Sequence, residues 1–105
     1  MAEQTNWFSV RVELQPAADY DALHKAMWNA GFRRFWVSNG GKKYKLPTGS
    51  YVIASSSSPA QIRDEVIKIA KSLTLVPILW IVQFVAADFW LYEIAEDPDA
   101  PKPKK

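Results

Sequence analysis

Apolar and polar residues alternate one by one near the start of the chain. Every second residue from Phe8 to Leu14 is apolar, and the residues between them are polar or charged. Such alternation places the apolar side chains on one face of an extended backbone. Pro16, which cannot donate a ladder hydrogen bond, follows shortly afterwards. The pattern predicts a strand over residues 7–14 that is buried on one face.

The spacing of apolar residues becomes helical after this strand. Tyr20, Leu23 and Met27 recur at intervals of three or four residues, as they do on one face of a helix. Asp19 can cap the N-terminus, and Gly31 can adopt the left-handed conformation that ends a helix. We therefore predict a helix over residues 19–30.

A second helix is predicted from the strongest local signal in the chain. Ser58 can cap it, Pro59 suits the first helical position, and Gln61 can complete a capping box. The apolar residues that follow share one helix face: Ile62, Val66, Ile69, Ala70 and Leu73.

Four further segments are predicted as strands: residues 32–38, 51–54, 78–85 and 89–95. The third of these is apolar on both faces, as expected inside a sheet or under a partner. The hairpin before residue 51 can turn at Asn39-Gly40 or at Pro47-Thr48-Gly49, and the sequence leaves both turns open.

The resulting order of strand, helix, strand, strand, helix, strand is typical of ferredoxin-like domains. We therefore expect an α+β fold, a ferredoxin-like βαββαβ sandwich. It would have a four-stranded antiparallel sheet, two helices on one face and a short extra C-terminal strand. Residues 1–95 would form this single domain, and the Pro- and Lys-rich residues 96–105 a disordered tail.

Composition narrows the classes of function. The net charge is +2, and three of the lysines lie in the last four residues, so any nucleic-acid contact must be local. There is no cysteine, which excludes thiol catalysis and thiolate-bound metal. The carboxylates show no metal-ligand spacing, so no metal or cofactor is expected. Without a secretory signal or a membrane-spanning run, we expect a cytoplasmic protein with no membrane partner.

One catalytic candidate and one binding candidate stand out. His24, the only histidine, is placed on the polar side of the first helix, where it could act as an acid or base. The alternative is an ordinary exposed histidine. Basic and aromatic residues gather around the hairpin, as in sites that bind single-stranded RNA: Arg33, Arg34, Trp36, Lys42, Lys43, Tyr44 and Lys45. The alternative there is a set of charges that guards a sheet edge.

Five tryptophans are more than one small core usually needs. Trp80 and Trp90 fall in the C-terminal strands, which suggests a homodimer formed through those strands. The alternative is a larger core than the pattern indicates.

The chain resembles the GhoS family, small ferredoxin-like endoribonucleases that are the antitoxins of type V toxin–antitoxin pairs. The matching residues are Met27, Phe32, Gly41, Leu46, Ser50, Tyr51, Ile53, Ser56, Ile62 and Asp64, together with the segment Val85–Phe89. The resemblance implies metal-independent cleavage of single-stranded RNA. Tyr51 falls at a position implicated in function, whereas His24 replaces the implicated arginine. The CRISPR-associated adaptation nuclease is also similar in fold. Its aspartate after the first strand is replaced here by Gln15-Pro16, which argues against metal-dependent cleavage.

Two hypotheses of function follow. The first is an RNA-binding, GhoS-like protein in which the basic residues hold phosphates, Tyr51 or Trp36 stacks on a base and His24 moves the proton. The second is a non-enzymatic interaction module, a phage or bacterial accessory protein that uses its sheet face or a dimer interface.

Overall fold

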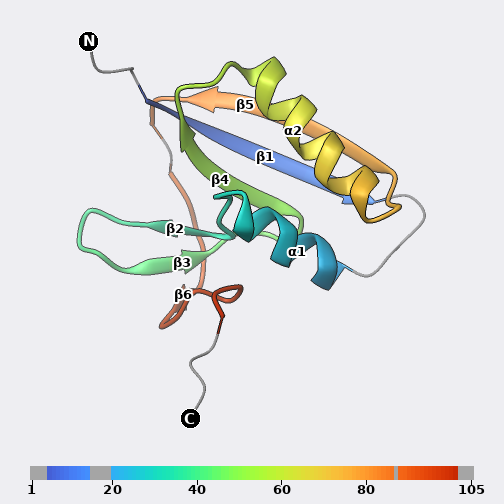
Figure 1. Ribbon diagram of the computed structural model, residues 1–105. Coiled ribbons are helices and arrows are strands. Elements are labelled where there is room, and N and C mark those ends of the chain that lie inside the picture. The colour runs from blue at the N-terminus through green and yellow to red at the C-terminus, as the bar shows by residue number, and fades with distance from the viewer. Residues whose placement is uncertain (1–4, 15–19, 87, 102–105) are drawn as a thin grey trace.

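A computed structural model describes residues 5–14, 20–86 and 88–101 of the chain. The elements in these ranges are β1 (Asn6–Leu14), α1 (Tyr20–Asn29), β2 (Phe35–Val37), β3 (Lys43–Lys45), β4 (Ser50–Ser55), α2 (Pro59–Ser72), β5 (Pro77–Phe84) and β6 (Glu93–Ile94). They form two helices and two three-stranded antiparallel sheets (Figure 1). The predicted α+β class is confirmed.

The larger sheet has the order β4-β1-β5, with β1 in the centre. Its register pairs Val10 with Tyr51 on β4 and with Ile81 on β5. The alternation predicted for β1 is confirmed, since the side chains from Phe8 to Leu14 that were expected inside are at most 3% exposed. One face of this sheet therefore carries the core.

Both helices pack on that face (Figure 1). Leu23 and Met27 of α1 meet Ile62 and Val66 of α2 in the same buried cluster as the inward residues of β1.

The start of α2 is as predicted. The side chain of Ser58 accepts a hydrogen bond from the N–H of Gln61, whose side chain accepts one from the N–H of Ser58. Neither described helix is long and apolar enough to cross a membrane.

The predicted four-stranded ferredoxin-like sheet is wrong. β2 joins a second sheet of order β2-β3-β6 instead of extending the first. The turn lies at the earlier of the two sites, where the N–H of Ser38 bonds to the carbonyl of Lys42, so β2 pairs with the nearby β3. Closing this short loop costs less chain entropy than pairing with a more distant strand. Only one bridge, Arg33 to Val52, marks the contact with β4 among the described residues.

A glycine turn sends the chain from β3 back to the larger sheet. Gly49 has a φ of +81°, and its carbonyl accepts a hydrogen bond of 2.7 Å from the N–H of Val12. A Cβ atom at this position would lie 2.5 Å from the carbonyl oxygen of Val12. The close approach of two backbones therefore requires glycine here.

The C-terminal part differs from the prediction in extent. The strand expected over residues 89–95 is reduced to β6, which pairs with β3. Within the segment expected to be a disordered tail, Asp97 and Asp99 have defined contacts with residues of α1 and of the segment that follows it. Residues 102–105 of that segment lie outside the described ranges.

Candidate functional site

His24 and Tyr51, to which the sequence analysis assigned proton transfer and base stacking, lie together in the core. His24 is 7% exposed and Tyr51 is 0% exposed, and a hydrogen bond of 2.7 Å joins His24 Nδ1 to the Tyr51 hydroxyl. The predicted surface positions of both residues are therefore wrong. The burial of His24 could have been predicted from the spacing, because His24 is one turn from Met27 and adjacent to Leu23, and both of these residues are fully buried.

Burial restricts what this pair can do. The ring of Tyr51 presents no face to solvent on which a nucleobase could stack. Removal from water raises the pKa of the Tyr51 hydroxyl above its ordinary value, since the phenolate would lose its solvation. The Tyr51 hydroxyl therefore keeps its proton, and its hydrogen bond with His24 holds α1 against β4.

The two arginines predicted to hold phosphates are already bound to carboxylates. Arg34 donates two hydrogen bonds to Asp99, of 2.6 Å from Nε and 2.7 Å from Nη2. These bonds raise the pKa of Arg34 above its ordinary value. Arg33 lies over the ring of Trp28, with its guanidinium carbon 4.4 Å from the ring centre, and its Nε is 3.7 Å from Asp97.

The lysines of the hairpin are separate from the arginines. Lys42 lies 3.5 Å from Glu93 of β6 in an exposed ion pair. Lys43 and Lys45 flank Tyr44 on β3, so they share the face of the strand opposite to Tyr44. The ring of Tyr44 packs on Phe89 at 4.9 Å. The members of the predicted basic cluster thus have different partners: Asp97 and Asp99 for the arginines, and Glu93 for Lys42.

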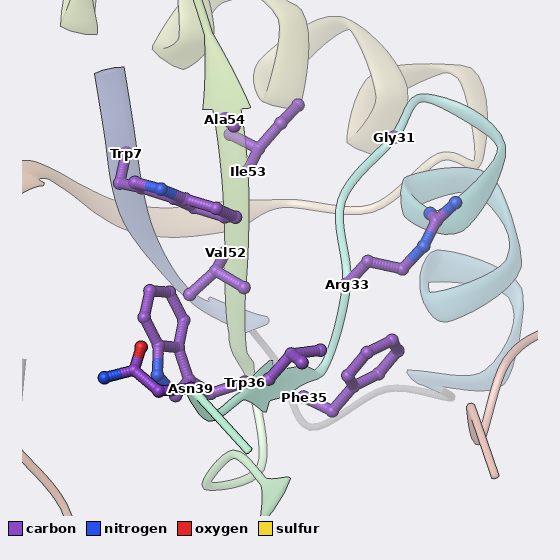
Figure 2. Close-up of a pocket in the computed structure, with 10 residues that line it drawn as sticks. Trp7, Gly31, Arg33, Phe35, Trp36, Asn39, Val52, Ile53 and Ala54 are labelled. Carbon is purple, nitrogen blue, oxygen red and sulfur yellow. The ribbon is translucent and has the colours of Figure 1, made fainter. Parts of the chain in front are cut away.

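Trp36, predicted to stack on a base, belongs to an aromatic cluster between the sheets. Its ring centre is 5.0 Å from that of Trp7 on β1 and 5.6 Å from that of Phe84 on β5. The two tryptophans border an open groove of about 520 Å³. Figure 2 shows both rings close to Val52, with the Arg33 side chain extending away from them. The groove is therefore mainly apolar and aromatic.

An uncovered apolar row lies on the outer side of β5. Ile78, Trp80 and Val82 are 55%, 72% and 42% exposed, whereas Leu79 and Ile81 pack against the core. β5 is also an edge strand of its sheet, and none of its residues is charged. The sequence pattern was apolar on both faces, but it could not tell whether the second face was covered.

No family model, curated protein sequence or solved structure matches this chain. Among the described residues, no group of three His, Cys, Asp or Glu side chains is placed to hold a metal ion.

Proposed function

We propose that the protein is a non-enzymatic interaction module that assembles through β5, and that the partner there is a second copy of the chain. The observation that carries this proposal is the row Ile78, Trp80 and Val82 on an edge strand. Covering large apolar side chains removes them from water and contributes roughly 25 cal/mol per Å² of apolar area.

The chemistry of the edge favours a second copy. β5 spans Pro77–Phe84, and edge strands of this length are usually guarded by charges that prevent pairing. Here the edge is neutral along its whole length, so two copies can pair antiparallel about a two-fold axis without meeting like charges. Such pairing would join two β4-β1-β5 sheets and bring both Trp80 side chains onto one continuous face.

Sedimentation velocity over a range of protein concentrations tests this proposal. We expect the wild type to dimerise and Trp80→Glu to sediment as a monomer, because a carboxylate would be buried in the interface. The matched control is Trp90→Glu, which changes a 97% exposed tryptophan outside β5 and should leave the dimer intact. A wild type that remains monomeric, or a Trp80→Glu dimer as tight as the wild type, contradicts the proposal.

Binding of single-stranded RNA is the second candidate. It is supported by Lys43 and Lys45 on one face of β3, where the ammonium of Lys43 lies 5.9 Å from the ring centre of Phe35. Membership of the GhoS family and ribonuclease activity remain predictions. A catalytic role for His24 would in addition require access to a side chain that is now buried.

Titration of labelled oligouridylate at several salt concentrations tests the second candidate. Lys43→Gln/Lys45→Gln should weaken binding and reduce its salt dependence, since each phosphate contact releases counterions. Lys68→Gln/Lys71→Gln removes the same charge from exposed positions of α2 and serves as the control. Equal binding by the two double variants argues against this site. If RNA incubated with the protein stays intact, both with and without a chelator, the hypothesis of ribonuclease activity is contradicted.

A further inference from the structure

Trp28 near the end of α1 and the two arginines that follow the helix bind two carboxylates of the C-terminal segment. The indole Nε1 of Trp28 donates a 2.7 Å hydrogen bond to Oδ2 of Asp97, and Arg34 binds both oxygens of Asp99. Arg33 lies on the ring of Trp28 and adds a positive charge beside Asp97. We call Trp28, Arg33 and Arg34 the anion site.

Arg34 and the two carboxylates are well shielded from solvent, whereas the side chain of Arg33 is 33% exposed. The side chains of Arg34 and Asp99 are 17% and 6% exposed, and that of Asp97 is 14% exposed. A hydrogen bond of 2.9 Å from the N–H of Asp99 to Oδ1 of Asp97 fixes the two carboxylates relative to each other. The contacts therefore form an ordered arrangement rather than a loose surface ion pair.

An adjoining groove of about 630 Å³ gives the anion site space for a larger ligand. Its lining includes Lys25 and Trp28 of α1, with Arg34 beside them. The C-terminal residues from Pro98 to Pro101 form another part of the lining, and Asp21 adds a second carboxylate to it. In Figure 1 the C-terminal segment, drawn in red, runs beside α1. Departure of this segment would expose the cations and widen the groove.

We infer that the anion site binds a phosphate-bearing ligand, and that Asp97 and Asp99 occupy it as internal ligands until that ligand displaces them. The guanidinium fork that holds Asp99 fits a phosphate equally well, because both groups present two acceptor oxygens in one plane with the donors. This inference is independent of assembly through β5.

The covalent connection makes the internal ligand a strong competitor. A tethered group acts at an effective concentration in the millimolar range. The apparent affinity for an external phosphate falls in proportion to the fraction of molecules in which the segment is released. The wild type should consequently bind phosphate ligands weakly, and removal of the two carboxylates should reveal the affinity of the cations.

The test compares full-length Asp97→Ala/Asp99→Ala with the wild type, using pyrophosphate and oligouridylate as separate probes in calorimetric titrations. We expect both probes, or the oligonucleotide alone, to bind at least about tenfold more tightly to the variant. Gain with both probes identifies a site for small phosphates, and gain with oligouridylate alone identifies a nucleic-acid backbone. Adding Arg34→Gln should abolish the gain.

Two controls separate this mechanism from a general change of charge. Asp64→Ala/Glu65→Ala removes two exposed carboxylates from α2 and raises the net charge equally, so it should give no gain. Asp97→Asn/Asp99→Asn keeps the size of both side chains, so it tests the inference even where alanine destabilises the fold. It should give an intermediate gain in phosphate affinity. Absence of a gain in both Asp97/Asp99 variants, or an equal gain in the α2 control, overturns the inference.

Discussion

The Nδ1 atom of His24 and the hydroxyl oxygen of Tyr51 lie 2.7 Å apart in the core. The bond connects α1 to β4 across the buried face of the larger sheet, and the ring of Tyr20 lies 5.9 Å from that of His24 on the same helix. Residues that the sequence suggested for chemistry at the surface thus form a polar contact that positions a helix.

Tyr51→Phe should lower the free energy of unfolding by about 1–2 kcal/mol, because it deprives a buried histidine nitrogen of this partner. Urea denaturation measures the change. Tyr92→Phe removes a hydroxyl from an 83% exposed residue and should change stability by less than about 0.5 kcal/mol. Equal effects of the two substitutions would show that the core hydrogen bond contributes little.

The ionisation of Tyr51 should make the free energy of unfolding depend on pH in the alkaline range. Burial raises the pKa of Tyr51 in the folded state, whereas the unfolded chain ionises at about pH 10. The folded state then retains a proton that the unfolded state has lost, so stability is complete below about pH 10 and falls as the pH rises further. Denaturation at a series of pH values should show the deficit of Tyr51→Phe shrinking above about pH 10. A constant deficit would contradict the raised pKa.

Gly49→Ala should destabilise the protein by about 3 kcal/mol, from the cost of a left-handed conformation and from overlap with the backbone of Val12. Gly41 has a similar φ of +83°, but a Cβ atom there meets nothing within 4 Å. Gly41→Ala should therefore cost only the conformational part, about 1 kcal/mol. Thermal unfolding of the two variants measures the difference, and similar costs would argue against the close approach.

Thr74 offers a substitution that should stabilise the fold. It follows α2 with a φ of +59°, a conformation that strains a β-branched residue, and the N–H groups of Thr74 and Leu75 close the helix on Lys71 and Ala70. Thr74→Gly should raise the free energy of unfolding by about 0.5–1 kcal/mol. Thr74→Ala keeps a Cβ atom and should gain less, so a larger gain for alanine would refute this explanation.

Some elements of the fold could be predicted from the sequence and others could not, and the difference has physical reasons. The strand β1 and the start of α2 were predictable because their signals are local: alternation in one case and a capping box in the other. The pairing of β2 was not, because a strand of three residues can use either of two neighbours and the choice depends on the turn.

The site was less predictable than the fold. Arg33 and Arg34 were recognised as cations, but their partners Asp97 and Asp99 lie more than sixty positions away in the sequence. Such pairing leaves no periodic trace. The exposed row on β5 was equally hidden, because an apolar strand looks the same in sequence whether or not another surface covers it.

The contact between the two sheets has a consequence for motion. Among the described residues, backbone pairing between β4 and the start of the smaller sheet is limited to the bridge at Arg33 and Val52. The rings of Trp7, Trp36 and Phe84 also meet between the sheets. Because so few backbone hydrogen bonds join it to the larger sheet, we expect the smaller sheet β2-β3-β6 to open before the larger sheet unfolds. Its amide hydrogens should exchange with solvent deuterium well before those of β1.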